Sequence, residues 1–159
     1  MKFSAQEEYG LRCLLHIGRM PEGKSCTIPE ISRMEGISSH NVAKFLRILR
    51  QSGFLQSVRG QAGGYTLARP AGQIIIGDVL KVLGGRLYEP DFCDEHSGMD
   101  DLCPHSVDCT IRSLWSRVQL SVDQVLTKTT LQDLLLTESQ FQHDQEQSRQ
   151  GYTNLVSLA

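Results

Sequence analysis

Apolar residues recur at helical spacing in three runs within the first third of the chain. Each run lies between a capping residue and a glycine, in the pairs Ser4 and Gly18, Thr27 and Gly36, and Ser38 and Gly53. Ser4 and Thr27 are each followed three residues later by a glutamate, which completes the capping box that satisfies free amides at a helix start. The pattern predicts three helices, of which the second and third are joined by a tight turn.

After Gly53 the sequence predicts two strands, Leu55–Arg59 and Tyr65–Ala68. The glycines between them suit a hairpin turn, which needs positive φ angles. Two helices joined by a glycine-containing turn form a helix-turn-helix unit, and a β-hairpin directly behind that unit makes a winged helix. We therefore expect a mainly α-helical fold with a small β-hairpin wing.

The second half of the chain is dominated by one long amphipathic helix. Its apolar positions recur at spacings of three and four residues, at Ile111, Leu114, Val118, Val122 and Val125. Trp115 and Leu120 lie outside this row and widen the apolar surface beyond what one small domain requires. A shorter apolar segment, Ile74–Val82, precedes this helix, and a last helical turn, Leu131–Leu136, follows it. From Glu138 the chain is polar and rich in glutamine.

Charge divides the chain at about the same place as these elements. Residues 1–69 hold ten Lys and Arg against five Asp and Glu, whereas residues 70–159 hold six against thirteen. A basic winged helix suits a polyanionic partner, and an acidic second half suits a different role. We expect a winged helix-turn-helix DNA-binding domain in residues 1–70, a cluster-binding and dimerisation region in residues 71–137, and a polar, flexible tail in residues 138–159.

The third predicted helix has a polar and basic face opposite its apolar face, formed by His40, Lys44, Arg47 and Gln51. On an isolated helix this face would simply be solvated, but in the second helix of a helix-turn-helix unit it is typical of DNA binding. Because the first residues of such a helix contact base edges, the candidate DNA contacts on this helix are Ser38, Ser39, His40, Asn41, Lys44 and Arg47. At the hairpin tip, Arg59 and Gln61 are candidates for contact with a minor groove or a phosphate.

The cysteine content has to be interpreted together with the cellular compartment. No apolar run approaches the roughly 20 residues needed to cross a bilayer, and the N-terminal segment MKFSAQEEYG lacks the apolar core of a secretory signal. We therefore expect no membrane association and a cytoplasmic location, where thiols stay reduced. There, an odd number of five cysteines favours metal binding or thiol chemistry over disulfides. Cys13 lies among apolar residues and is expected in the core, whereas Cys26 only precedes a helix cap.

The other three cysteines lie in or next to a segment with almost no apolar periodicity, Glu89–Asp108. Cys93, Cys103 and Cys109 are separated by nine and five residues and stand among acids, histidines and prolines. This spacing lacks the Cys-x2-Cys pair of common zinc sites. Soft thiolates at irregular spacing suit an iron–sulfur cluster, whose fourth ligand can come from elsewhere. The alternative is that the three cysteines are incidental to a polar loop.

Over residues 1 to about 137 the chain resembles the winged-helix iron–sulfur regulators of the IscR, NsrR and RirA type. The resemblance rests on the segments Ser57–Leu67 (SVRGQAGGYTL) and Ile76–Val79 (IGDV), the three-cysteine loop, and Leu114-Trp115. It implies a winged helix-turn-helix plus a long dimerisation helix, a homodimer whose long helices pair, and one cluster per subunit. It further implies a transcriptional regulator, expected to be a repressor, that binds an inverted repeat in double-stranded DNA and senses nitric oxide, redox state or iron supply.

The fourth ligand is where the chain departs from part of this family. Regulators of the IscR type have a histidine three residues after the last cysteine, and Arg112 stands there instead. The NsrR type takes a carboxylate from the partner subunit, near the start of the first helix. Glu8 occupies the matching position, since Glu7 is expected to cap the helix. The resemblance thus implies Cys93, Cys103, Cys109 and Glu8 as ligands, and favours [4Fe–4S] over [2Fe–2S]. A solvated Glu8, with His96 or His105 as the ligand, is the alternative.

Other classes of function are less well supported by the sequence. No nucleophile-and-base motif, dinucleotide fingerprint or His-Glu zinc motif is present, so we do not expect an enzyme. A winged-helix module with a structural zinc, and a cluster-free regulator whose cysteines act as thiol redox switches, are the two rival interpretations. Metal analysis and colour separate the zinc module from a cluster protein, because a bound cluster is brown and zinc is colourless. An anaerobically purified sample that lacks both iron and acid-labile sulfide would support the thiol switch.

Overall fold

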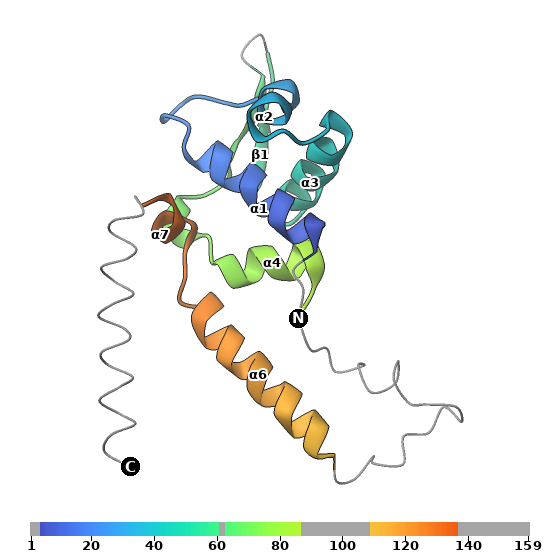
Figure 1. Ribbon diagram of the computed structural model, residues 1–159. Helices are drawn as coiled ribbons and strands as arrows, with labels where there is room; N and C mark the ends of the chain where they lie inside the picture. The colour runs from blue at the N-terminus through green and yellow to red at the C-terminus, as the bar shows by residue number, and fades with distance from the viewer. Residues whose placement is uncertain (1–3, 61–62, 87–108, 137–159) are drawn as a thin grey trace.

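The computed structural model describes residues 4–60, 63–86 and 109–136. In chain order its elements are α1 (Ala5–Gly18), α2 (Ile28–Glu35), α3 (Ser39–Gln51), β1 (Leu55–Val58), β2 (Gly64–Leu67), η1 (Ala71–Gln73), α4 (Ile76–Gly84), α6 (Thr110–Leu126) and α7 (Leu131–Leu135) (Figure 1). The two strands form one antiparallel sheet. The prediction of a mainly helical fold with a small hairpin is confirmed, and the strand bounds differ from the predicted ones by one residue. The predicted tail, residues 138–159, lies outside the described residues.

Capping explains where the N-terminal helices begin. The Ser4 hydroxyl accepts the amide of Glu7 at 3.2 Å, and the Glu7 carboxylate accepts the amide of Ser4 at 2.7 Å. Thr27 and Glu30 make the same reciprocal pair at the start of α2. At the end of α2, Gly36 has a φ of 66°, which side chains with a Cβ rarely adopt. This glycine makes the sharp turn between α2 and α3.

The head of the molecule, which consists of α1 to α4, the hairpin and α7, has one hydrophobic core. α3 contributes Val42, Phe45, Leu46 and Leu49, which form the apolar face of the helix and are all buried. Residues beyond position 70 share this core, namely Ile74, Ile76, Val79, Leu83 and Leu131. The segments α4 and α7 therefore pack beneath the winged helix and stabilise it (Figure 1).

The wing is fixed to the head through Cys26. The Cys26 amide donates to the carbonyl of Tyr65 at 3.0 Å, and the Tyr65 amide donates to the carbonyl of Cys26 at 2.8 Å. Gly64 permits this approach, because a Cβ at that position would lie 2.6 Å from the Cys26 carbonyl oxygen. The segment before α2 thus continues the two-stranded sheet by one bridge.

α6 extends away from the head, below α4 (Figure 1). Among its residues only Gln119 is buried. Ile111, Leu114 and Val125 are exposed by 61%, 53% and 64%. An apolar stripe that the rest of the described chain does not cover is unusual in a monomeric protein. None of the described helices combines the length and the hydrophobicity required to cross a bilayer.

Candidate functional site

The DNA-facing candidates on α3 all lie on its solvent side. His40, Asn41, Lys44 and Arg47 are exposed, and the opposite side of the helix is packed into the core. Ser38 caps the helix, since its hydroxyl accepts the amide of Asn41 at 3.3 Å. The core therefore holds α3 so that a row of polar and basic side chains points outward, as an element that enters a DNA groove requires.

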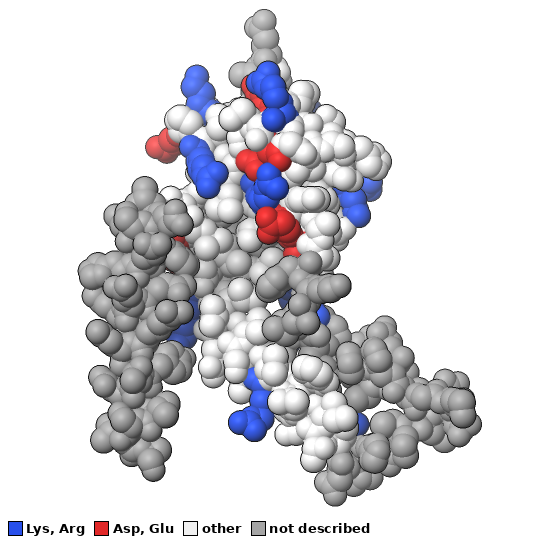
Figure 2. Space-filling model, in the orientation of Figure 1, with Lys and Arg blue, Asp and Glu red and all other residues white. Residues whose placement is uncertain are grey.

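The wing places a further cation beyond the end of β1. Arg59 is exposed there and precedes Gly60, whose φ of 109° marks the start of the turn. Gln61, the second wing candidate, lies outside the described residues. On the face shown in Figure 2, Lys and Arg side chains are spread over the head and interspersed with Asp and Glu.

Cys109 is the described member of the predicted ligand set of cysteines. It is half-buried at the N-cap of α6, where its sulfur accepts the amide of Arg112 at 3.2 Å. Amide hydrogen bonds to the sulfurs of ligating cysteines tune the reduction potential of iron–sulfur clusters. Cys93 and Cys103 lie outside the described residues. Within the part of the chain that the structure describes, no group of three or more His, Cys, Asp and Glu side chains converges.

The remaining two cysteines, Cys13 and Cys26, are buried. Burial, reinforced by the charge of Glu35, raises the pKa of Cys13 to about 12. Burial and the nearby Glu30 also raise the pKa of Cys26. Both stay protonated at neutral pH, and a protonated thiol is a poor metal ligand. The expectation that Cys13 belongs to the core is confirmed.

The first turn of α1 contains Glu8, the predicted fourth ligand. The Glu7 carboxylate is used by the capping box, as the sequence indicated, and Glu8 is exposed. The same turn is docked on the end of α4: the Gln6 amide group donates to the Leu83 carbonyl, and Glu7 contacts Gly84 so closely that a Cβ there would lie 2.4 Å from it. The start of α1 therefore lies at the point where α4 leads into the cysteine segment.

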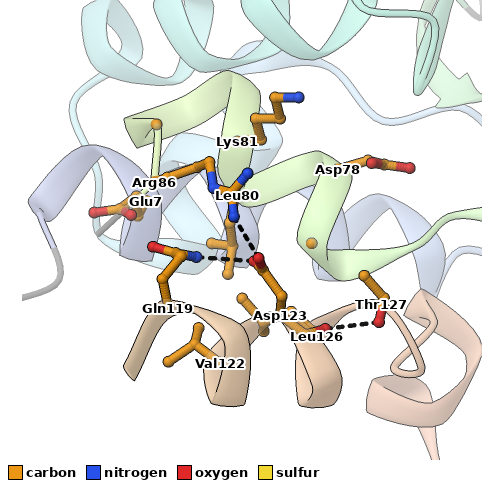
Figure 3. Close-up of a pocket in the computed structure, with 12 residues that line it drawn as sticks. Glu7, Asp78, Leu80, Lys81, Arg86, Gln119, Val122, Asp123, Leu126 and Thr127 are labelled. Carbon is orange, nitrogen blue, oxygen red and sulfur yellow. Dashed lines mark hydrogen bonds and ion pairs between the residues drawn. The ribbon is translucent and has the colours of Figure 1, made fainter. Parts of the chain in front are cut away.

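A pocket of about 230 Å³ separates α4 from α6 (Figure 3). In it, Arg86, two residues after the end of α4, forms an ion pair with Asp123 of α6, and the buried Gln119 of the same helix donates to Asp123 at 2.8 Å. The ion pair attaches the long helix to the residues directly after α4. Sequence reasoning missed it, because residues 37 positions apart give no local signal.

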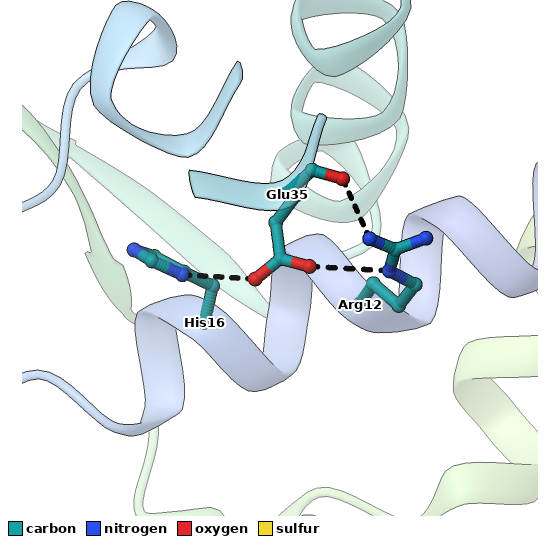
Figure 4. Close-up of polar contacts among 3 residues, drawn as sticks. All are labelled: Arg12, His16 and Glu35. Carbon is teal, nitrogen blue, oxygen red and sulfur yellow. Dashed lines mark hydrogen bonds and ion pairs between the residues drawn. The ribbon is translucent and has the colours of Figure 1, made fainter. Parts of the chain in front are cut away.

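A second cluster that the sequence did not indicate lies between α1 and the end of α2 (Figure 4). The Glu35 carboxylate accepts Nε of Arg12 at 3.1 Å and lies 3.0 Å from Nδ1 of His16. Arg12 also donates to the Glu35 carbonyl at 2.6 Å. The side chains of Glu35 and His16 are each only 15% exposed. Arg12 and His16 are four residues apart, so they share one face of α1, but nothing local predicts that Glu35 lies against it.

The winged helix, with a basic and polar recognition face on one side and a long uncovered helix on the other, defines the class: a transcriptional regulator of the winged helix-turn-helix type. The chain belongs to the Rrf2 family, whose model, described as "Iron-dependent Transcriptional regulator", matches residues 3–137.

Individual relatives agree with this assignment. The protein rrf2 of Nitratidesulfovibrio vulgaris (strain Hildenborough) is 33% identical over 135 residues, which is 85% of this chain and 87% of that protein. Among solved structures, CymR (YrzC), the global cysteine regulator of B. subtilis, is similar with a TM-score of 0.67 and 28% identity, covering 85% of this chain and 96% of CymR. The IscR of T. potens is similar with a TM-score of 0.67 and 28% identity, and the match covers 85% of this chain and 86% of the IscR chain.

Proposed function

We propose that this Rrf2-family regulator binds an inverted-repeat operator in double-stranded DNA as a homodimer, and that an iron–sulfur cluster controls that binding. The observation that supports DNA binding best is the geometry of α3. Its apolar side is buried in the head, and His40, Lys44 and Arg47 are exposed on the other side.

Each DNA-facing candidate has a role that follows from its chemistry. Ser38, Ser39, His40 and Asn41, at the start of α3, contact base edges in the major groove. Lys44 and Arg47, further along the helix, pair with phosphates. Arg59 and Gln61 at the wing reach the minor groove or the backbone.

A second copy of the chain is the partner that the apolar stripe of α6 requires. Ile111, Leu114 and Val125 are more than half exposed, and the hydrophobic effect favours covering them at about 25 cal/mol for each Å² of apolar surface. Pairing two such helices by a two-fold axis also gives two recognition helices, which matches an inverted repeat.

The proposed cluster ligands are Cys93, Cys103, Cys109 and Glu8, with Glu8 supplied by the partner subunit. The described donors suit such a group: Cys109 offers a half-buried sulfur with an amide hydrogen bond, and Glu8 offers an exposed carboxylate. Three thiolates and one carboxylate favour [4Fe–4S] over [2Fe–2S]. When bound, the cluster supplies a site that reacts with nitric oxide or oxygen and that responds to the supply of iron. Glu8 is the ligand most easily displaced, because a carboxylate is harder than a thiolate.

A specific observation favours a second candidate, a cluster-free regulator controlled by thiol oxidation. A similar solved structure is an oxidised form of CymR from Staphylococcus aureus, with 27% identity and a TM-score of 0.67. In this alternative the cysteines themselves respond to the oxidant. A zinc-stabilised winged helix is the corresponding metal-bound variant.

Selection of bound duplexes from a random library by the dimer tests the DNA-binding proposal. We expect an inverted repeat to be enriched, with an affinity that falls steeply as salt rises, because phosphate contacts release counterions. Arg59→Ala is expected to weaken operator binding by about 1–3 kcal/mol. Lys128→Ala, an exposed lysine between α6 and α7 that belongs to neither α3 nor the wing, is the matched control and should bind like the wild type. No enriched site in any cluster state would contradict the proposal.

Iron and acid-labile sulfide analysis of anaerobically purified protein tests the cluster. We expect iron and sulfide in equal amounts and a brown sample, whereas zinc without sulfide would favour the structural-metal variant. A sample free of all three would favour the thiol switch. Glu8→Ala is expected to retain iron but to change its stability to oxygen. A Glu8 variant that assembles and reacts like the wild type would assign the fourth ligand elsewhere, with His105 the next choice.

A further inference from the structure

Glu35 occupies an unusual place for an acid in the basic half of the chain. It is the last residue of α2 and directly precedes Gly36, the turn that leads into α3. Its side chain is 15% exposed and lies against α1, not in solvent. A carboxylate that is largely removed from water needs compensating partners, and here both partners come from the neighbouring helix.

Those partners fix the end of α2 in two ways. Arg12 donates to the Glu35 carboxylate at 3.1 Å and to the Glu35 backbone carbonyl at 2.6 Å, so one guanidinium holds both the side chain and the helix end (Figure 4). His16 lies at 3.0 Å from the other carboxylate oxygen. Hydrogen bonds to charged groups are stronger and more directional than neutral ones. The last turn of α2 is therefore held at a defined place on α1.

A second set of contacts connects Arg12 to α3 through Tyr9. The Arg12 guanidinium lies 5.7 Å from the centre of the Tyr9 ring, and that ring packs against Phe45 of α3 with ring centres 6.5 Å apart. Phe45 is on the buried face of α3. The position of Arg12 is thus coupled both to the end of α2 and to the side of α3 that faces the core.

The turn between α2 and α3 couples the position of Glu35 to the start of α3. The Ser32 hydroxyl donates to the Ile37 carbonyl at 2.6 Å, and the Ser39 hydroxyl donates to Ser32 at 3.1 Å. Ser39 is the first residue of α3. A short turn with these bonds has little freedom, so a shift at Glu35 moves the start of α3.

We propose that Glu35 is a positioning residue for DNA recognition, which sets the angle at which α3 presents its DNA-facing side chains by holding Arg12 and His16 of α1. This inference rests on the proposed DNA-binding function. A positioning role and a purely electrostatic role of Glu35 predict opposite changes in operator affinity when Glu35 is replaced. Removing a negative charge from a basic domain would by itself strengthen binding to every DNA, whereas losing a positioning contact weakens binding to the operator.

The test compares Glu35→Ala, Glu35→Gln and the wild type on the selected operator and on a random duplex. For Glu35→Ala we expect operator affinity to fall by about tenfold, since two charged hydrogen bonds are lost. Affinity for the random duplex should equal or exceed that of the wild type, because a negative charge is removed and no phosphate contact is lost, and the salt dependence of binding should stay close to the wild type. Glu35→Gln keeps the acceptor for Arg12 without the charge and should lose about threefold on the operator. Glu22→Ala, an exposed acid in the turn after α1, removes the same charge without these contacts, so it is the control and should leave the operator-to-random ratio unchanged.

The outcomes separate this inference from the function it rests on. A wild-type chain that prefers no duplex overturns the proposed function and this inference with it. A wild type that prefers its operator, with Glu35 variants whose operator-to-random ratio is unchanged or raised, overturns the positioning role alone. If circular dichroism shows Glu35→Ala unfolded, Glu35→Gln decides: an operator-to-random ratio equal to the wild type overturns the proposal, and a reduced ratio supports it.

Discussion

α3 and α6 are both amphipathic helices, and they differ in what covers their apolar faces. In α3, the apolar residues Val42, Phe45, Leu46 and Leu49 are buried in the head. In α6, Ile111, Leu114 and Val125 of the apolar row are exposed, and the single buried residue, Gln119, is polar. The same periodicity therefore has two outcomes. It shows that a helix has a face to bury, and it does not show whether the covering surface belongs to the same chain.

The two helices also begin differently. α3 is capped by the hydroxyl of Ser38, which accepts the amide of Asn41, and α6 is capped by the sulfur of Cys109, which accepts the amide of Arg112. A hydroxyl is one of the preferred helix caps, whereas cysteine is not among the residues favoured there. Helix capping alone therefore does not require a thiol at the start of α6.

Cys109→Ser separates these two roles and has the largest expected effect. Serine is as good a cap as the residue it replaces, so the helix content measured by circular dichroism should not change. Iron and sulfide should be lost almost completely, because a hydroxyl does not replace a thiolate as a soft ligand. Cys26→Ala is the control and should keep its iron. Wild-type iron content in Cys109→Ser would show that this sulfur is only a cap.

Leu46→Ala and Leu114→Ala compare the two apolar faces directly. Leu46 is fully buried, and its truncation should lower the free energy of unfolding by about 2–5 kcal/mol. Leu114 is 53% exposed in the single chain, and its truncation should cost the chain less than about 0.5 kcal/mol beyond any effect on association. Denaturant titrations at low and high protein concentration measure both. Equal losses at low concentration would contradict the contrast between α3 and α6.

Leu114→Asp tests the proposed partner of α6 and has an intermediate effect. A charge in the apolar stripe should raise the dimer dissociation constant at least tenfold, equivalent to about 1.4 kcal/mol. Sedimentation or light scattering over a concentration series measures it. Gln124→Asp adds the same charge to the polar side of α6 and should leave association unchanged. A wild type that is monomeric at all concentrations would refute the homodimer.

Replacement of Cys13 has the smallest expected effect on stability, and it tests whether the core of the head excludes water from this thiol. Its pKa is raised to about 12 from 9.0 by burial and by the charge of Glu35, so the unfolded thiol loses its proton at lower pH than the folded one. The resulting stability is complete below about pH 9 and is lost as pH rises towards 12. Above pH 9 the free energy of unfolding of the wild type should therefore fall more steeply than that of Cys13→Ala, by about 1 kcal/mol per pH unit. Denaturant titrations between about pH 8 and 10.5 test this, and parallel curves would exclude it.

Local sequence was enough to predict most of the fold. The reciprocal capping of Ser4 with Glu7 and of Thr27 with Glu30, the glycine at the end of α2, and the buried face of α3 all follow from residues within one or two turns of each other. The hairpin was predicted for the same reason. Family membership also rested on contiguous segments, and the match over residues 3–137 confirms it.

The candidate site was only partly predictable. The outward face of α3 follows from its periodicity, and the positions of its residues agree with the expectation, although their contacts with DNA stay a prediction. The contacts that hold α3 and α6 in place did not follow: Arg12 meets Glu35 across 23 residues, and Arg86 meets Asp123 across 37. Charged residues on an amphipathic helix have many possible partners, and only the packing of the helices selects one.

By itself, the sequence determined which segments become helices and strands, which faces are apolar, and that three of the five cysteines are grouped within residues 93–109. These properties depend on neighbouring residues along one chain. The tertiary structure alone decided that α4 and α7 share the core of the winged helix, that Glu35 contacts both Arg12 and His16, and that Ile111, Leu114 and Val125 of α6 stay exposed. Such properties depend on close packing between distant segments, and packing is fixed by the shape of the whole core rather than by any local pattern.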